Sequence, residues 1–409
     1  MNPSHARPDN RRRILLLSSS TGSGHDRRAE AFRNWVEELY PDQFEVRQEQ
    51  IIENSSRLGA FGVWLYNQIQ RHGPIAHNLY WEIVELFTAT HSQSVSYGGR
   101  YYRELLQSYR PHLVLSLHDC TNRGYFQDAR KVLGDSVRTM TYCGEWSGGR
   151  GFSVNWAEPS VDRFVARTNA ARMHAIELGV PADKASVLTN FLPRRALGGS
   201  YSLVEKKAAR QSFGLHPERF TVFISTGSQG ASHHLRFLRS LLPLADRVQA
   251  IVVCGRNEKA CEQVRAWHQR HPQLALHLEG FSRRMPELMR ASDCVVTRGG
   301  ANTAAEALQA GCPVVFHTLG GMMPQERLTV QYFQAQAAGE LVHNEEELEK
   351  LLARWLDRPG DYQRLLHRFR QLRADDRPED LLHDIAEMLG VRSKRAATAH
   401  ELAPVAAVS

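Results

Sequence analysis

The sequence lacks the features that mark several common protein classes. No apolar run approaches the roughly 18 residues that a membrane-spanning helix needs, so no transmembrane segment is predicted. The six cysteines are scattered without a Cys-x-x-Cys pair, and the amino terminus, MNPSHARPDNRRR, is polar and basic, unlike a secretory signal. We therefore expect no zinc site, reduced thiols and a cytoplasmic protein.

Two phosphate-binding signatures and one metal-binding signature are also missing. The glycine loop at residues 21–25 contains no lysine, which a P-loop requires, and Arg27 replaces the third glycine of a GxGxxG fingerprint. No Asp-x-Asp motif follows a predicted strand, so we expect no metal ion and no other cofactor. The charge of +7 and the pI of about 9.2 suit an anionic small molecule or membrane surface. Without an RNA- or DNA-binding signature, we expect no nucleic-acid partner.

What the sequence does contain is a repeated strand–loop–helix pattern. Alternation of short apolar runs with helical periodicity is typical of parallel sheets covered by helices, so we predict an α/β protein with two halves of similar size. The apolar runs lie at 14–17, 113–117, 220–225, 250–254, 294–297 and 313–316. Proline and two glycines interrupt the periodicity near residue 193 and place a linker there. The predicted segments are a disordered terminus (1–11), a first domain (12–192), the linker (193–204), a second domain (205–376), a last helix (377–390) and a flexible tail (391–409).

The first glycine loop places a histidine where a strand meets a helix. His25 follows Gly24 at the carboxyl end of the first predicted strand, which is the usual ligand crevice of open α/β sheets. Glycines let the backbone approach a ligand, and a helix amino terminus favours negative charge. A tight turn with an exposed histidine explains the same residues, so spacing alone leaves both interpretations open.

Three further motifs follow strands in the second half. Ser228 lies in a glycine loop after 220–225, and Gly299 and Gly300 precede a predicted helix that Asn302 or Thr303 would cap. Glu306 is expected in the first turn of that helix, where a carboxylate either complements the helix dipole or binds a ribose diol. After the run at 313–316, Gln325 and Glu326 present an amide and a carboxylate, or only polar residues at a helix start.

Together, in this order, these motifs resemble two-domain glycosyltransferases of the GT-B fold, which have two Rossmann-like domains facing across a cleft. Within them the chain resembles the monogalactosyldiacylglycerol synthase and processive diacylglycerol glucosyltransferase family. The segments that carry the resemblance are STGSGHDRRAEAF, LYNQIQRHGPIAHNLYWEI, RPHLVLSLH, residues 161–188, EGFSRRMPELMRASDCVVTRGGANTAAEALQAGCPVVF and MMPQERLTV. The last helix would then cross back to the first domain.

The resemblance implies a role for each matching residue. Phe281, or the backbone after it, would meet a uracil ring. Ser228 and the turn Gly299, Gly300 and Ala301 would face the diphosphate of a UDP-sugar, and Glu306 would bind the ribose. Gln325 and Glu326 would bind hydroxyls of the sugar. The remaining expected donor contacts are Gly24, Asn302 and Thr303.

The resemblance implies a hexosyltransferase. Because helix amino termini and backbone N–H groups can stabilise a leaving diphosphate, we predict that it works without a metal, and we predict inversion at the anomeric carbon by direct displacement. His25 is the first candidate for the general base, because the pKa of a histidine suits proton transfer near neutral pH. Asp119 and Glu145 are rival bases. The family usually has a Thr-Asp pair where this chain reads TMTYCGEW at residues 139–146, so Glu145 stands in for that aspartate or the acceptor site has changed.

The acceptor is expected in a segment rich in aromatic and basic residues. Aromatic rings suit the headgroup depth of a membrane and cations suit anionic lipid, but plain helical core packing explains the same pattern. The residues singled out are Trp64, Tyr66, Arg71 and Trp81. The resemblance favours a lipid hydroxyl, such as that of diacylglycerol, and peripheral contact with the inner face of the plasma membrane. A soluble acceptor, an epimerase and a nucleotide-sugar-binding module without catalysis remain open.

Overall fold

The computed structural model describes residues 11–21, 24–72, 82, 98–188, 201–225, 233–372 and 379–391, with side chains to residue 69 in the second range. The expected terminal segments up to residue 10 and from 392, and the linker up to residue 200, lie outside these ranges.

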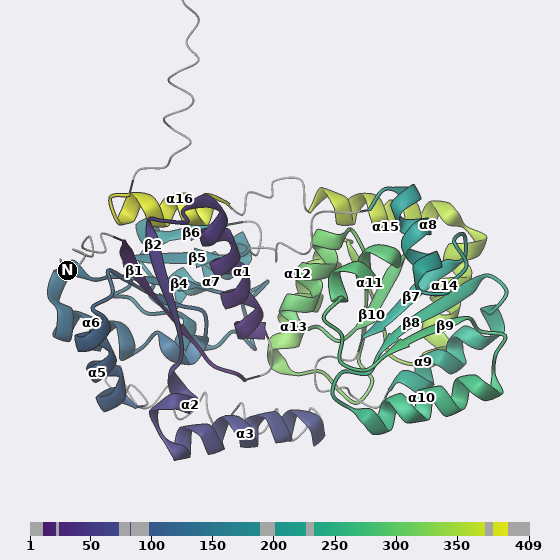
Figure 1. The fold of residues 1–409 in the computed structure, drawn as a ribbon. Helices are drawn as coiled ribbons and strands as arrows, with labels where there is room; N and C mark the ends of the chain where they lie inside the picture. The colour runs from purple at the N-terminus through teal and green to yellow at the C-terminus, as the bar shows by residue number, and fades with distance from the viewer. Residues whose placement is uncertain are drawn as a thin grey trace, which may run out of the picture.

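The amino-terminal half is built on a six-stranded parallel sheet (Figure 1). In sheet order its strands are β2 (Phe44–Gln50), β1 (Arg12–Ser18), β3 (Leu113–Ser116), β4 (Arg138–Tyr142), β5 (Arg163–Ala166) and β6 (Ala185–Val187). The central strands are apolar and buried on both faces, as β1 shows from Ile14 to Leu17. The helices are α1 (Gly24–Leu39), α2 (Ile51–Ser55), α3 (Arg57–His72), α5 (Gly99–Tyr109), α6 (Tyr125–Leu133) and α7 (Asn169–Glu177), with the short 3₁₀ turns η1 (Asp119–Thr121), η2 (Gly134–Ser136), η3 (Val154–Trp156) and η4 (Ala182–Lys184).

The C-terminal half repeats the plan with a second six-stranded parallel sheet. Its strands, in sheet order, are β12 (Gly339–Val342), β11 (Val314–His317), β10 (Cys294–Thr297), β7 (Phe220–Ser225), β8 (Val248–Val253) and β9 (Leu276–Glu279). Its helical elements are α8 (Leu203–Ser212), α9 (His234–Leu241), η6 (Leu242–Leu244), α10 (Glu258–Arg270), α11 (Met285–Ala291), α12 (Ala301–Ala310), α13 (Pro324–Ala335), α14 (Glu345–Asp357), α15 (Pro359–Gln371) and α16 (Glu379–Met388). The prediction of two α/β halves with parallel sheets is confirmed.

The strands that the sequence analysis did not name include all four sheet edges. The outer strands are β2 and β6 in the first sheet and β12 and β9 in the second. Their sequences, FEVRQEQ, ASV, GELV and LHLE, are short or polar, because an edge strand is not enclosed on every side. A search for continuous apolar runs therefore finds six interior strands and passes over the edges, and it also misses the interior strands β4 and β5, whose sequences RTMTY and RFVA contain polar residues.

The two halves pack directly on one another. Figure 1 shows α1 of the amino-terminal half facing α12 and α13 of the C-terminal half. Between them, the buried Trp146 ring packs against Tyr332 and Phe333, with centroids 5.1 and 4.9 Å apart. Its Nε1 donates a hydrogen bond of 3.0 Å to the carbonyl oxygen of Ala301, the first residue of α12. The end of β4 and the start of α12 are thereby tied together.

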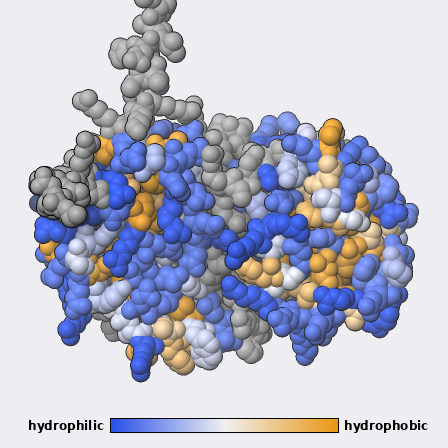
Figure 2. Space-filling view, in the orientation of Figure 1, coloured by the Kyte–Doolittle hydropathy of each residue, from blue (hydrophilic) through white to orange (hydrophobic). Residues whose placement is uncertain are grey.

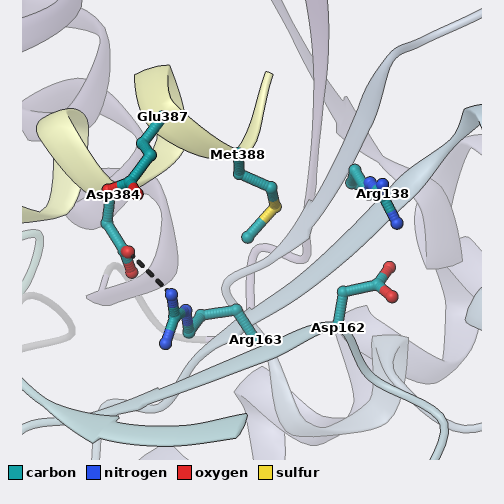
Figure 3. A pocket seen from close by; sticks show the side chains of 6 residues that line it. All are labelled: Arg138, Asp162, Arg163, Asp384, Glu387 and Met388. Atoms are coloured by element: carbon teal, nitrogen blue, oxygen red, sulfur yellow. Dashed lines mark hydrogen bonds and ion pairs between the residues drawn. The ribbon is translucent and has the colours of Figure 1, made fainter. Parts of the chain in front are cut away.

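The last helix, α16, lies over the amino-terminal half although it follows the C-terminal half in sequence (Figure 1). Tyr40 at the end of α1 hydrogen-bonds His383 at 2.8 Å, and Arg163 pairs with Asp384 at 2.9 Å (Figure 3). Beside this ion pair lies a cavity of about 370 Å³, lined by Arg138, Asp162, Arg163, Asp384, Glu387 and Met388. The cavity lies at the amino-terminal ends of the strands, because Arg138 and Arg163 are the first residues of β4 and β5. His25 lies at the opposite, carboxyl ends.

Candidate active site

Hydrogen bonds from four elements hold the loop that follows β1. The backbone N–H and hydroxyl groups of the serines contact Glu53 of α2 and Asp26 of α1. Gln50, at the end of β2, donates to Ser20 Oγ at 2.6 Å and to Asp26 at 3.0 Å, and Asn67 of α3 donates to the carbonyl oxygen of Ser20 at 3.0 Å. The polar residues of the run Ser18–Ser20 therefore fix where α1 begins, which positions His25.

The geometry around His25 indicates which ring nitrogen is available. Its Nδ1 lies 2.8 Å from the carbonyl oxygen of Leu117, at the end of β3. Arg28 Nη2, which only donates, also lies 3.0 Å from Nδ1, but the carbonyl is closer and only accepts, so we infer that Nδ1 carries the proton and that Nε2 keeps the lone pair. Burial, the neighbouring His118 ring with its centroid 4.1 Å away, and Arg28 hold the pKa of His25 well below its usual value. At neutral pH the imidazole is therefore uncharged and can accept a proton, although the lowered pKa weakens it as a base.

His118 differs from His25 because both of its ring nitrogens are engaged. Nε2 lies 2.7 Å from Thr21 Oγ1, and Nδ1 lies 2.7 Å from Asp119 Oδ1. Burial alone would raise the pKa of Asp119, but the charge and hydrogen bond of His118 outweigh burial and lower it. A carboxylate with a lowered pKa is a poor base, so Asp119 is better suited to orienting the histidines.

Glu145 lies beyond the carboxyl end of β4, near Arg28 and Asp119. We call the space around His25, His118, Arg28 and Glu145 the crevice. Burial raises its pKa to about 7, although the positive charges of Arg28 and Arg167 oppose this. Its Oε1 accepts a hydrogen bond of 3.3 Å from Trp156 Nε1. A carboxyl group poised near neutral pH can exchange protons during a reaction, so Glu145 remains a rival to His25 as the base.

The start of α1 meets the start of α12. A Cβ at Gly24 would lie only 2.0 Å from Asn302 Nδ2, and a Cβ at Gly299 would lie 2.3 Å from the carbonyl oxygen of Glu326. At Gly299 glycine is thus required for the backbones to approach, whereas at Gly24 a side chain would displace the amide end of Asn302. Gly300 precedes α12 and makes no side-chain cap, so the first N–H groups of α12 are available to an anion.

Two expectations about this helix are wrong. Neither Asn302 nor Thr303 caps α12, because the helix begins at Ala301 with Gly300 at the cap position. For the same reason Glu306 is the sixth residue of the helix rather than part of its first turn, and the dipole does not explain it. Glu306 is nonetheless buried, and the Oδ1 atom of Asn302 is buried without a hydrogen-bond partner in the described part of the chain.

The loop after β11 leads to Gln325 and Glu326 in the first turn of α13. Glu326 Oε2 accepts hydrogen bonds from the backbone N–H of Met323 at 2.9 Å and from Arg298 Nη2 at 2.8 Å. Burial raises the pKa of Glu326, and Arg298 opposes that effect. Gln325 Oε1 is buried and has no hydrogen-bond partner among the described residues. Gln325 rather than Glu326 therefore offers a side-chain oxygen that can accept a hydrogen bond from a ligand hydroxyl.

Phe281, expected to meet a base, follows β9 and is 45% exposed. The guanidinium of Arg256, from the loop after β8, lies 4.8 Å from its ring centroid. The ring therefore stands at the carboxyl edge of the second sheet outside the hydrophobic core. Ser228, expected at the diphosphate, lies outside the described residues.

An exposed aromatic pair lies on α3. The rings of Phe61 and Trp64 stack with centroids 5.5 Å apart, and they are 54% and 53% exposed. Leu58 and Leu65 are exposed beside them, and Figure 2 shows apolar surface at the lower edge of the molecule near α3. Among the acceptor residues, Tyr66 is half-buried, whereas Trp81 and the side chain of Arg71 lie outside the described residues. The exposure of Trp64 is therefore not explained by packing in the core.

None of the helices in the described ranges is long and apolar enough to cross a bilayer.

Sequence reasoning missed two buried arginines at this site. Arg28 follows His25 by one turn of α1, and Arg167 follows β5 and donates to the carbonyl oxygen of Ala301 at 2.9 Å. The Arg167 guanidinium also lies 4.5 Å from the ring centroid of Trp146. Arginines in loops and amphipathic helices usually face solvent, so the sequence contained no signal for their burial.

Comparison with known proteins identifies the class. Residues 221–361 match the glycosyltransferase family 28 C-terminal domain. The chain is a glycosyltransferase. Its homologues include the monogalactosyldiacylglycerol synthase of Spinacia oleracea, 22% identical over 93% of this chain and 73% of the relative. They also include the processive diacylglycerol beta-glucosyltransferase of Bacillus subtilis, 21% identical over 94% of this chain and 98% of the relative. The family resemblance predicted from the motifs is confirmed.

Solved structures identify the fold of this glycosyltransferase. MurG of Acinetobacter baumannii superimposes with a TM-score of 0.60 at 15% identity, covering 93% of this chain and 99% of MurG. HepE of Anabaena, in complex with UDP-glucose, superimposes with a TM-score of 0.56 at 14% identity, covering 92% of this chain and 99% of HepE. The GT-B fold expected from the sequence is thereby confirmed.

Proposed function

We propose that this glycosyltransferase moves a hexose from a UDP-sugar to the hydroxyl of a membrane lipid such as diacylglycerol, with inversion and without a metal ion. One observation carries the proposal most directly. His25, with an available Nε2, stands beside the uncapped start of α12, where Gly24 approaches Asn302. A base and an anion site thus lie side by side, as displacement of a nucleoside diphosphate requires.

The donor would bind to the C-terminal half. The first N–H groups of α12 would stabilise the diphosphate, since a helix amino terminus favours negative charge. The buried Glu306 would hold the ribose diol, and the unpartnered oxygen of Gln325 would accept a hydroxyl of the sugar. Phe281 would stack on the uracil. Binding of UDP-glucose by HepE and the names of the curated relatives support this assignment.

The acceptor hydroxyl would approach His25 from the amino-terminal half. As its oxygen attacks C1 of the sugar, His25 Nε2 would take the proton, and the bond between C1 and the diphosphate would break. Because α12 offers N–H groups to the leaving charge, the step needs no metal. Direct displacement inverts the configuration at C1.

The lipid nature of the acceptor is supported by α3. Exposed Trp64 and Phe61 suit the interface of a membrane, where aromatic rings lie at headgroup depth. Peripheral contact of this kind would bring a lipid hydroxyl to the amino-terminal half. The relatives named for diacylglycerol support the same choice.

We expect calorimetric titration to detect binding of UDP in preference to GDP, ADP and TDP. Glu306→Ala should weaken UDP binding about 10-fold or more, because a buried carboxylate that accepts ribose hydroxyls contributes roughly 1.5–3 kcal/mol. Glu346→Ala, which removes an exposed carboxylate on α14, is the control and should leave UDP binding unchanged. Binding of none of the nucleotides would refute the transferase proposal, and preference for another nucleotide would refute the donor assignment.

We expect the product to carry the configuration opposite to that of the donor sugar, and transfer to continue in a metal chelator. NMR of the purified product reports the anomeric configuration. Transfer in EDTA should match transfer in added Mg²⁺, because helix N–H groups rather than a cation stabilise the leaving diphosphate. A retained configuration, or activity abolished by EDTA and restored by Mg²⁺, would contradict the displacement described above.

A further inference from the structure

A guanidinium is buried beside His25 without an ion pair to any described carboxylate. Arg28 is only 5% exposed. Its Nη2 lies 3.0 Å from His25 Nδ1, and its Nε and Nη1 have no hydrogen-bond partner among the described residues. With the tautomer inferred above, in which His25 Nδ1 donates to Leu117, this close contact joins two donors and does not satisfy Arg28.

The backbone leaves room for this guanidinium. A Cβ at Gly144 would lie 2.2 Å from Arg28 Nη1, and the ring centroid of Trp156 lies 5.8 Å from Arg28 Cζ. An uncompensated buried charge costs several kcal/mol in general, and proteins ordinarily pair such a charge. A purely structural role would call for a carboxylate within bonding distance, and no described carboxylate forms an ion pair with Arg28.

The buried positive charge in the crevice exceeds the negative charge. Arg167 is a second buried cation near Arg28. Of the two nearby carboxyl groups, Asp119 is engaged by His118, and Glu145 has a pKa raised to about 7 and is only partly ionised at neutral pH. The crevice therefore favours an anionic ligand.

We propose that Arg28 binds an acidic group, a phosphate or a carboxylate, carried by the acceptor close to the hydroxyl that receives the sugar. This inference rests on the proposed transferase function and narrows its acceptor. Arg28, His25 and Gly144 all belong to the amino-terminal half, whereas the groups expected to hold the UDP-sugar lie on the C-terminal half. Diacylglycerol, the example given above, has no acidic group to pair with Arg28, so the acceptor inferred here is instead a membrane lipid that carries one.

An anion on Arg28 would also assist the reaction. The positive charge of Arg28 is one of the causes that lower the pKa of His25. An acceptor that neutralised this charge would raise the pKa of His25 and make it a better base for its own hydroxyl. The acceptor would thus help to activate the residue that deprotonates it.

The test uses two lipids that differ only in a phosphate, 1-acylglycerol 3-phosphate and 1-acylglycerol with the same acyl chain. Their affinities for the UDP-saturated full chain, and their transfer rates, are compared in the native protein and in Arg28→Met and Arg28→Lys. We expect the native protein to prefer the phosphate lipid. Arg28→Met should abolish that preference, with a loss of about 10- to 100-fold, and Arg28→Lys should keep part of it.

Arg27→Met is the matched control, because Arg27 is the adjacent residue and forms an ion pair with Glu30 on the surface. It should keep the native preference. Removal of an uncompensated charge should leave the melting temperature of Arg28→Met equal or higher, whereas a structural role for Arg28 predicts a lower one. If Arg28→Met does not fold, the lipid pair and Arg28→Lys still provide the test.

Two results would overturn the inference. Equal affinity of the native protein for the two lipids would show that the acceptor needs no acidic group. Loss of UDP affinity in Arg28→Met, with the lipid preference unchanged, would assign the guanidinium to the diphosphate. Failure of the proposed function is distinguishable, because UDP would then not bind to the native protein at all.

Discussion

Replacing His25 with alanine should lower sugar transfer by about 100- to 10,000-fold, the usual contribution of a general base. The physical reason is the single available lone pair near the start of α12. Leu117 engages Nδ1 of His25, while both ring nitrogens of His118 are engaged by Thr21 and Asp119. UDP affinity should stay within about twofold of the native value, because the groups proposed to hold UDP lie on the C-terminal half. Transfer rates and calorimetry on the same preparation measure the two effects.

The exposed His216 provides the control for this variant. His216→Ala removes an imidazole from the loop before β7, far along the chain from the crevice, and should leave transfer and UDP binding unchanged. If His25→Ala retained transfer while Glu145→Gln lost it, Glu145 would be the base. If His25→Ala lost UDP binding as well as transfer, His25 would act on the diphosphate and not on the acceptor.

Six of the eight interior strands could be predicted from the sequence for a clear physical reason, whereas β4 (RTMTY) and β5 (RFVA) were missed because they are not continuous apolar runs. A parallel strand buried on both faces needs a continuous apolar run, and β1 and β10 are such runs. Edge strands do not need one, so β2, with its polar sequence FEVRQEQ, gave no comparable signal. The order of strands depends on packing between distant segments, which a single sequence does not display.

The candidate site was predictable where backbone geometry dictates residue type. Gly24 and Gly299 stand where a Cβ would collide with the opposite element, so glycine loops after strands indicated real close approaches. The start of α12 was misplaced because asparagine and threonine are preferred caps, whereas the chain uses Gly300. A single sequence does not show which of two adjacent arginines is buried: Arg27 forms an ion pair with Glu30, whereas Arg28 lies in the interior.

Buried charge without full compensation is the common property of this crevice. Two guanidinium nitrogens of Arg28 have no hydrogen-bond partner among the described residues, and Glu145 resists ionisation because burial raises its pKa to about 7. Such arrangements reduce stability in the unliganded protein and are typical of sites shaped for a ligand rather than for folding. The stability of the protein should therefore respond to pH through Glu145.

The sign of that response follows from the raised pKa. Below about pH 4.5 the carboxyl group is protonated in both the folded and the unfolded chain, and its burial carries no ionisation cost. As the pH rises towards 7, the unfolded chain ionises freely while the folded one does not, so stability is lost. The shift corresponds to a loss of up to about 3 kcal/mol at pH 8, since one pKa unit corresponds to about 1.4 kcal/mol.

Glu145→Gln should therefore stabilise the protein at pH 8 by up to about 3 kcal/mol and have little effect at pH 4.5. Glutamine stays neutral, and its side-chain oxygen can still accept the hydrogen bond from Trp156 Nε1. Urea unfolding of both proteins at the two pH values measures the difference. Glu346→Gln, on the exposed side of α14, is the control and should show no pH-dependent gain. The same stabilisation at both pH values would contradict the raised pKa, because it would then arise from packing and not from ionisation.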